Sequence, residues 1–212
     1  MVMTFEQFKQ LFVEIADRIE QVKDELSELD RQLGDGDHGV TMSIGWQAIV
    51  DKIRQSEASD CGALLKEIAM AFLNAVGSSV GPLYATAFLR GSAALPGKTE
   101  LTHRDLVSFW EAAIQGIQER GKAKIGDKTM MDTWLPVLGV LKTQSEKDEI
   151  GKDIYDKALA EAENGMNATA SLVSQLGRSS RLGDRSVGHM DPGAVSAYYI
   201  FQTFVQYVRK VM

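Results

Sequence analysis

The chain has 212 residues, of which 44% are hydrophobic and 25% are charged, and its formal net charge is -6 at pH 7 with a sequence pI near 5.2. This length suits one large domain or two small ones, and the composition excludes an extensively disordered chain. The acidic balance, without a cluster of lysines and arginines, excludes a general nucleic-acid or anionic-membrane surface, so neither partner is expected.

The single cysteine, Cys61, excludes an internal disulfide. The N-terminus MVMTFEQFKQ lacks the basic stretch followed by an apolar stretch that marks a signal peptide. No window approaches the roughly 18 consecutive apolar residues of a membrane span. We therefore expect a cytoplasmic protein in a reducing compartment.

Apolar residues recur at steps of three and four along most of the chain, which predicts amphipathic helices. The expected helices cover residues 5–29, 40–53, 64–76, a segment after Pro82, and residues 106–117, 131–141, 154–172 and 194–208. No segment alternates with a period of two, so no convincing strand is predicted. The sequence thus predicts an all-α fold of about eight helices, in which the three tryptophans belong to the core.

Every second connection between these helices is rich in glycine. The glycines are Gly34, Gly36, Gly39, Gly77, Gly81, Gly121, Gly126, Gly177, Gly183 and Gly188. The other connections, SEASD (56–60), PGKTE (96–100) and QSEKDE (144–149), are short and polar. In an antiparallel bundle, alternate connections lie at the same end. We therefore expect the glycine-rich loops to meet at one end of a single domain spanning residues 1–212, although any one glycine could simply end a helix.

The loop LDRQLGDGDHG (29–39) matches the dinucleotide-binding pattern G-x-G-x-x-G. That pattern requires a preceding strand, whereas a helix is predicted here. A calcium-binding EF-hand would need a glutamate at Trp46 or Thr41, depending on where the loop is counted from. An aspartyl nucleophile of the haloacid type would need a parallel sheet, which is not predicted. These three functions are therefore excluded.

Three carboxylates remain in that loop, those of Asp30, Asp35 and Asp37. Magnesium prefers a few carboxylates together with water and phosphate oxygens, so its ligand completes the site. Three solvated loop aspartates are the alternative, but like charges held close together favour a bound cation. The loop therefore indicates a Mg²⁺ site.

Other glycine-rich connections carry groups suited to phosphate. His38-Gly39-Val40-Thr41 opens a helix, where free N–H groups favour an anion. Gly77-Ser78-Ser79-Val80-Gly81-Pro82 opens another, although its serines could merely cap the helix.

The connection 173–193 contains three arginines within an acidic protein, and about twenty residues without predicted structure is long for a compact domain. Such an arginine could neutralise a transferring phosphoryl group, whereas a solvated basic loop is the alternative. The arginines are Arg178, Arg181 and Arg185. His103 and His189 are interpreted as structural or surface residues.

Taken together, four segments resemble the nucleotide-binding L subunit, or L domain, of dihydroxyacetone kinases. LDRQLGDGDHG is similar to Asp-x4-Asp-x-Asp-His-Gly, GSSVGPLYAT to Gly-x-x-x-Gly-Pro-Leu, and GDKTMMDTWLPV to Gly-Asp-Lys-Thr-Met. GRSSRLGDRSVGHMDPGA resembles the family's last motif, with Asp184 where glutamate is expected. The resemblance implies an eight-helix antiparallel up-and-down barrel with a nucleotide site at one end.

The resemblance also implies a role for individual residues. Asp30, Asp35 and Asp37 would hold two Mg²⁺ ions that bridge to the nucleotide. Contacts to the phosphates would come from His38, Gly39, Val40, Thr41, Ser78, Ser79 and Val80. The nucleoside pocket would be lined by Gly121 and Met130. The site would be closed by Arg178, with a catalytic role, and by the turn Asp191-Pro192-Gly193.

Family resemblance further implies partners. Since the sequence holds one domain, we expect the phosphotransferase-system version, in which tightly bound ADP is rephosphorylated by a phosphohistidine of an M subunit. The phosphoryl group then passes to dihydroxyacetone on a K subunit. Three alternatives stay open: a regulatory adaptor that binds a transcription regulator, an L domain serving an ATP-dependent or other kinase, and, for the assembly, a homodimer.

Overall fold

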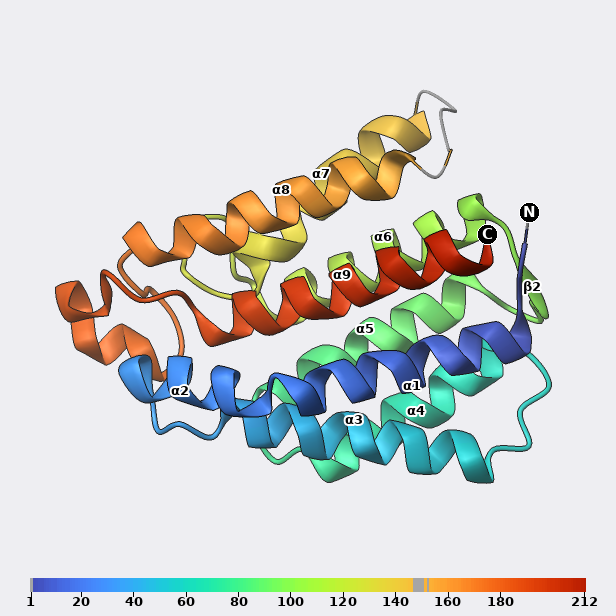
Figure 1. Cartoon of the computed structure of the whole chain (residues 1–212), viewed down its shortest axis with the longest axis horizontal. Helices are drawn as coiled ribbons and strands as arrows, with labels where there is room; N and C mark the ends of the chain where they lie inside the picture. Colours follow the sequence, from blue (N-terminus) through green and yellow to red (C-terminus); the bar gives the residue numbers. More distant parts are fainter. Residues whose placement is uncertain (1, 147–150, 152) are drawn as a thin grey trace.

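The computed structural model describes residues 2–146, 151 and 153–212. Over these residues the structure is helical apart from one short strand pair (Figure 1). The α-helices are α1 (Phe5–Gln21), α2 (Lys23–Leu33), α3 (His38–Gln55), α4 (Cys61–Ala75), α5 (Val80–Ala94), α6 (His103–Gly121), α7 (Met131–Glu146), α8 (Asp153–Ala168) and α9 (Pro192–Val211). Two 3-10 helices, η1 (Thr169–Ser171) and η2 (Arg178–Ser186), precede α9.

The helices form a closed ring in chain order. Helices α1 and α2 both pack against α3, consecutive helices pack side by side from α3 to α9, and α9 returns to pack against α1. Because α1 and α2 continue one another, they form one of the eight antiparallel rods into which the described residues fold (Figure 1). The predicted all-α, eight-helix up-and-down barrel is therefore confirmed. None of the described helices is both long enough and apolar enough to cross a membrane.

The first rod differs from the continuous helix predicted over residues 5–29. It is interrupted at Val22, where ψ is 7°, and it continues to Leu33. Val22 is buried, as is Leu26 one turn later, so the apolar face continues through the interruption. The periodicity of the sequence therefore could not reveal it.

Aromatic side chains fill the interior of the barrel. Trp46 packs with its ring 6.2 Å from that of Phe12 and 6.4 Å from that of Phe72. Trp110 stacks on Trp134 at 5.1 Å. All three tryptophans are at most 7% exposed, as expected of core residues. Nearly all of the buried apolar residues belong to one cluster, which stiffens the scaffold on which the loops are mounted.

The chain termini lie together at one end of the barrel (Figure 1). There β1 (Met3–Thr4) pairs antiparallel with β2 (Glu100–Leu101), and the Phe5 amide donates to the Thr99 carbonyl at 2.8 Å. The expectation of no strand was therefore wrong for these residues, because two-residue strands are too short to show alternation. The polar connection predicted at 144–149 lies outside the described residues over 147–149.

Helices α7 and α8 approach closely where α7 contains Pro136. Proline lacks the N–H that would bind the Asp132 carbonyl, so that oxygen is free to face α8. A Cβ at Gly165 would come within 1.9 Å of this oxygen and 3.2 Å of Pro136 Cγ. A glycine is therefore required at this crossing.

We expect Gly165→Ala to lower the free energy of unfolding by about 1–3 kcal/mol, because the added methyl group forces the two helices apart. Gly139→Ala is the matched control, since a Cβ at this exposed position of α7 meets nothing within 4 Å. The control should gain about 0.5–1 kcal/mol. Urea unfolding measures both changes, and equal effects would contradict the close crossing.

Candidate functional site

A cavity of about 820 Å³ opens at the end of the barrel opposite the chain termini. All four glycine-rich connections contribute to its walls, as the order of the loops predicted. Its volume lies within the range of small-molecule sites. Of the candidate residues, its walls include Asp30, Asp35, Asp37, His38, Thr41, Ser78, Ser79, Val80, Gly121, Met130, Arg178, Asp191, Pro192 and Gly193.

Three carboxylates converge at the mouth of this cavity. Asp30 lies on the last turn of α2, and Asp35 and Asp37 lie in the connection to α3. Each offers an oxygen, and the three oxygens lie within 4.8 Å of one another. Asp30 is half-buried, whereas the other two are exposed. Hard oxygen donors at this spacing, open to solvent on one side, fit Mg²⁺ completed by water or phosphate.

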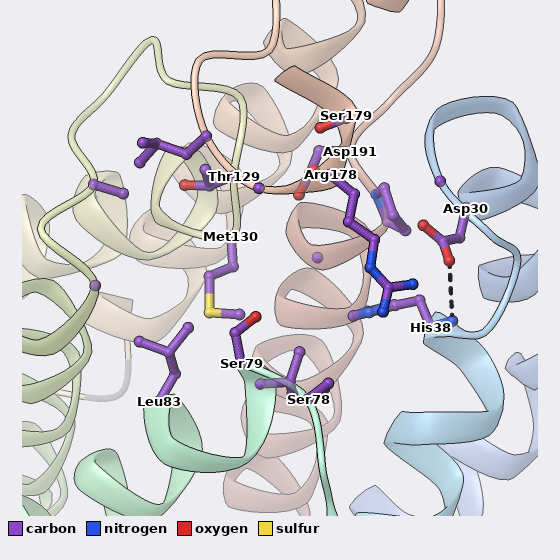
Figure 2. A pocket seen from close by; sticks show the side chains of 18 of the residues that line it. Asp30, His38, Ser78, Ser79, Leu83, Thr129, Met130, Arg178, Ser179 and Asp191 are labelled. Carbon is purple, nitrogen blue, oxygen red and sulfur yellow. Dashed lines mark hydrogen bonds between the residues drawn. The ribbon is translucent and has the colours of Figure 1, made fainter. Parts of the chain in front are cut away.

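The orientation of Asp30 is fixed by the start of α3. Its Oδ2 accepts a hydrogen bond from the amide of Asp37 at 2.9 Å. It also accepts one from the amide of His38 at 3.2 Å (Figure 2). Asp30 therefore caps α3 from another helix. Gly34 allows this fold of the chain, since a Cβ there would come within 2.6 Å of Asp30 Oδ1.

Of the four residues at the start of α3 that were expected to contact phosphate, only two line the cavity. Gly39 packs against α2, where a Cβ would come within 1.9 Å of the Lys23 carbonyl oxygen. Val40 is 48% exposed, and neither residue belongs to the walls of the cavity. His38 and Thr41 do line it. The amide of His38 is already bonded to Asp30, so it is not a free donor for an anion.

His38 is buried at the floor of the cavity, and its Nε2 lies 2.9 Å from Ser196 Oγ. The Ser196 hydroxyl donates its proton to the Gly193 carbonyl at 3.0 Å, so it accepts from His38. This pattern assigns the ring proton to Nε2. Burial lowers the pKa of His38 to about 4, against the opposing effect of Asp30. The imidazole is therefore neutral near pH 7.

The other side of the cavity is apolar. Leu83 and Met130 face one another there, away from Arg178, His38 and Asp30 (Figure 2). A Cβ at Gly121 would lie 3.0 Å from a methyl group of Leu83, so the absence of a side chain keeps this side open. At the start of α5, the buried Ser78 Oγ has no hydrogen-bond partner among the described residues. Ser78 thus has a free hydroxyl beside the cavity.

The arginine-rich connection is not the structureless loop that the sequence predicted. It contains η2, which is kinked at Gly183 with a φ of 55°. Short 3-10 turns have no apolar period, so the pattern could not reveal them. Arg178 lines the cavity, whereas Arg181 and Arg185 are exposed and do not.

Arg178 forms ion pairs with the carboxylates of the cavity mouth. Its guanidinium pairs with Asp35 and lies 3.7 Å from Asp37 Oδ2. These two carboxylates also belong to the candidate metal site. The arginine therefore supplies the positive charge that three convergent carboxylates require.

Lys128 and Thr129 are among the wall residues to which the sequence assigned no role. Lys128 is 1% exposed and Thr129 follows it, both in the connection before α7. Lys128 has a left-handed backbone, with a φ of 59°. Lys128 lies in the segment GDKTMMDTWLPV, whose resemblance to a family motif indicated a functional region. No local pattern indicated which groups its ammonium contacts.

Asp191 begins α9, where its Oδ2 accepts the Ala194 amide at 2.8 Å. Burial raises the pKa of this carboxyl to about 7, and the Ala194 hydrogen bond opposes the shift. Pro192 follows at the first helical position, which suits its fixed φ. The turn of Asp191, Pro192 and Gly193 thus forms a rigid part of the cavity wall.

Comparison with known proteins agrees with this geometry. The sequence profile described as the DAK2 domain matches residues 32–206. The chain belongs to the DAK2 domain family. This DAK2 protein is 38% identical to "PEP-dependent dihydroxyacetone kinase, ADP-binding subunit DhaL" of Escherichia coli (strain K12), over 84% of each chain. It is also 38% identical to "PTS-dependent dihydroxyacetone kinase, ADP-binding subunit DhaL" of Lactococcus lactis, over 91% of this chain and 92% of that protein.

A solved structure shares the fold of this DAK2 protein. It is that of the dihydroxyacetone kinase from C. freundii in complex with AMP-PNP and Mg²⁺. The TM-score is 0.73 at 21% identity, over 93% of this chain and 33% of that chain. The resemblance to the L subunits of dihydroxyacetone kinases is therefore confirmed, by sequence for the family and by structure for the fold.

We expect the contribution of Asp191 to the stability of the metal-free and nucleotide-free DAK2 protein to decrease as the pH rises toward 7. The raised pKa of Asp191 means that the folded state keeps a proton that the unfolded state loses above about pH 4. Asp191→Asn cannot titrate and still caps α9. Its advantage over the wild type in urea unfolding should grow from near zero at about pH 4 to on the order of 1–3 kcal/mol at about pH 8. A pH-independent difference would contradict a raised pKa.

Proposed function

We propose that this DAK2 protein is the ADP- and Mg²⁺-binding subunit of a phosphoenolpyruvate-dependent dihydroxyacetone kinase. The observation that carries the proposal is the convergence of Asp30, Asp35 and Asp37 at the mouth of a cavity whose other side is apolar. Such a cavity suits a ligand with a phosphate end and an aromatic end. Relatives named as ADP-binding subunits align with most of the chain and support the same function.

Two Mg²⁺ ions would be held by the three aspartates, which would neutralise the repulsion between carboxylates and phosphates. The exposed oxygens of Asp35 and Asp37 are free to serve both ions once Arg178 moves away. Asp30 has one oxygen bonded to backbone amides, so its other oxygen would serve as a ligand. Tight retention of ADP would follow from metal and phosphate contacts together.

Contacts to the nucleotide follow from the two sides of the cavity. Leu83, Met130 and Gly121 would enclose the adenine ring. Ser78 and Ser79 would donate hydroxyl protons to phosphate or ribose oxygens, because the Ser78 hydroxyl has no partner among the described residues. The phosphates would then extend toward the aspartates.

In the proposed reaction a phosphoryl group leaves a histidine nitrogen of an M subunit and bonds to a β-phosphate oxygen of ADP, which gives ATP. It then leaves that oxygen for a hydroxyl oxygen of dihydroxyacetone on a K subunit, and the hydroxyl proton goes to a base there. Arg178 would stabilise the charge on the transferring group. The role of this chain is positioning and charge neutralisation.

We propose that residues 1–212 form a single L-type domain whose site is completed by its partners. To receive the phosphoryl group and then to pass it on, the mouth of the cavity has to face an M subunit and a K subunit in turn. The buried, unpaired Cys61 is compatible with the cytoplasm, where such subunits would meet.

The test is to combine the chain with a K subunit and a phosphorylated M subunit at catalytic levels of ADP. We expect triose phosphate to form from phosphoenolpyruvate. Asp35→Asn should weaken Mg²⁺-dependent ADP retention by about tenfold or more, as loss of a metal contact does. Asp51→Asn, which removes an exposed carboxylate paired with Arg54 on α3, should have no effect.

Absence of Mg-ADP binding in calorimetry and native mass spectrometry would overturn the proposed function. A requirement for stoichiometric ATP would overturn the role of ADP as a bound coenzyme. Full transfer by Asp35→Asn would favour a regulatory adaptor instead.

Arg178 and a bound metal ion would compete for the carboxylates of Asp35 and Asp37. Without nucleotide, Arg178→Gln should bind Mn²⁺ roughly two- to fivefold more tightly than the wild type, because an exposed ion pair no longer opposes the metal. Arg181→Gln removes the same charge from the same segment but does not line the cavity, so its affinity should not change. Electron paramagnetic resonance of free Mn²⁺ measures both, and equal gains would indicate a general effect of net charge.

A further inference from the structure

Lys128 has an ammonium group that is buried and fully bonded. The side chain is 1% exposed, and Nζ donates to the carbonyls of Ser186 and His189 at 2.6 Å each and to that of Leu172 at 3.2 Å. A lysine has three protons to donate. All three are directed at protein carbonyls, which leaves none for a phosphate.

The three carbonyls belong to the two ends of one segment. We call residues 173–188, which contain η2 and Arg178, the arginine segment. Leu172 immediately precedes it, Ser186 lies near its far end, and His189 immediately follows it. One ammonium thus ties together the start and the finish of the arginine segment.

Further hydrogen bonds hold the two ends of the arginine segment in place. The Ser174 amide donates to Ser186 Oγ at 2.9 Å, and the Gly188 amide donates to the Ala170 carbonyl at 2.7 Å. The Gln175 amide donates to the Asp127 carbonyl at 3.1 Å, next to Lys128 in sequence. The two ends of the arginine segment are therefore held together by hydrogen bonds, of which the one between Ser174 and Ser186 is buried, whereas the Arg178 side chain beyond them is 61% exposed.

The turn that carries Lys128 is itself braced. Asp132 accepts the amides of Gly126 at 2.6 Å and Thr129 at 2.8 Å through its two carboxylate oxygens. These bonds hold Lys128 in its left-handed conformation, which a residue with a side chain adopts at a cost in energy. The left-handed conformation orients the Lys128 side chain toward the three carbonyls that it contacts.

We propose that Lys128 is a positioning residue that fixes the arginine segment, and with it Arg178, over the mouth of the cavity. The inference rests on the proposed phosphoryl transfer and adds a residue through which Arg178 is held in place. Three carbonyl dipoles that point at one buried spot require a cation there. Loss of the charge therefore releases both ends of the segment.

Lys128→Met should lower the rate of phosphoryl transfer by about a hundredfold, as misplacement of a catalytic group does. ADP affinity should fall much less, because the aspartates and the apolar side of the cavity are unchanged. Hydrogen exchange of the amides in residues 174–188 should accelerate, while that of α3 and α9 should not. Lys210→Met, which removes an exposed ammonium paired with Glu14, is the control and should behave as the wild type.

A double-mutant cycle separates positioning from general destabilisation. If Lys128 acts through Arg178, Lys128→Met should not slow transfer further in an Arg178→Gln background. A slowing by the same factor in both backgrounds would overturn the inference. Rescue gives a second measure: n-propylammonium added to Lys128→Ala should restore both transfer and slow exchange of the arginine segment, and failure of both would also overturn it.

Should Lys128→Met fail to fold, Lys128→Gln replaces it in each measurement, since its amide still donates two hydrogen bonds. Unchanged exchange in residues 174–188 of a folded variant would overturn the role of Lys128, whatever the transfer rates. Absence of transfer by the wild-type chain would instead overturn the proposed function, and the exchange data would still decide whether Lys128 fixes the segment.

Discussion

The carboxylate of Asp30 connects the fold to the candidate site. By accepting the first amides of α3, it fixes the angle between the end of α2 and the start of the next helix. The connection between them must then turn sharply, which places Asp35 and Asp37 beside Asp30. A hydrogen bond that satisfies a helix end thereby creates a concentration of negative charge. This charge accounts for the ion pairs of Arg178 with Asp35 and Asp37.

The closed ring of helices makes this local arrangement useful. Because neighbouring helices are antiparallel, segments from residue 30 to residue 193 meet at one end of the barrel. Aromatic side chains pack the interior, so the loops are mounted on a rigid support. The polar and apolar sides of the cavity then lie at fixed positions relative to one another. A site of this kind can hold a nucleotide with little adjustment of the scaffold.

Buried polar groups around the cavity have two different roles. His38, Ser196 and the Gly193 carbonyl form a chain of hydrogen bonds that fixes the floor. Lys128 and the three carbonyls that it contacts fix the two ends of the arginine segment above the mouth of the cavity. Both arrangements join parts of the chain that are far apart in sequence. They convert a ring of loops into a cavity with a defined shape.

The sequence by itself determined the helical class, the order of the rods and the end at which the glycine-rich loops meet, because periodicity and loop order are local properties of a chain. It also identified Asp30, Asp35 and Asp37, since three carboxylates within eight residues need no tertiary information to be noticed. The tertiary structure alone decided that Gly39 contacts α2 and that Val40 points away from the cavity. It likewise decided the partners of Lys128, because those are backbone carbonyls 44 to 61 residues away, and a carbonyl carries no mark in the sequence.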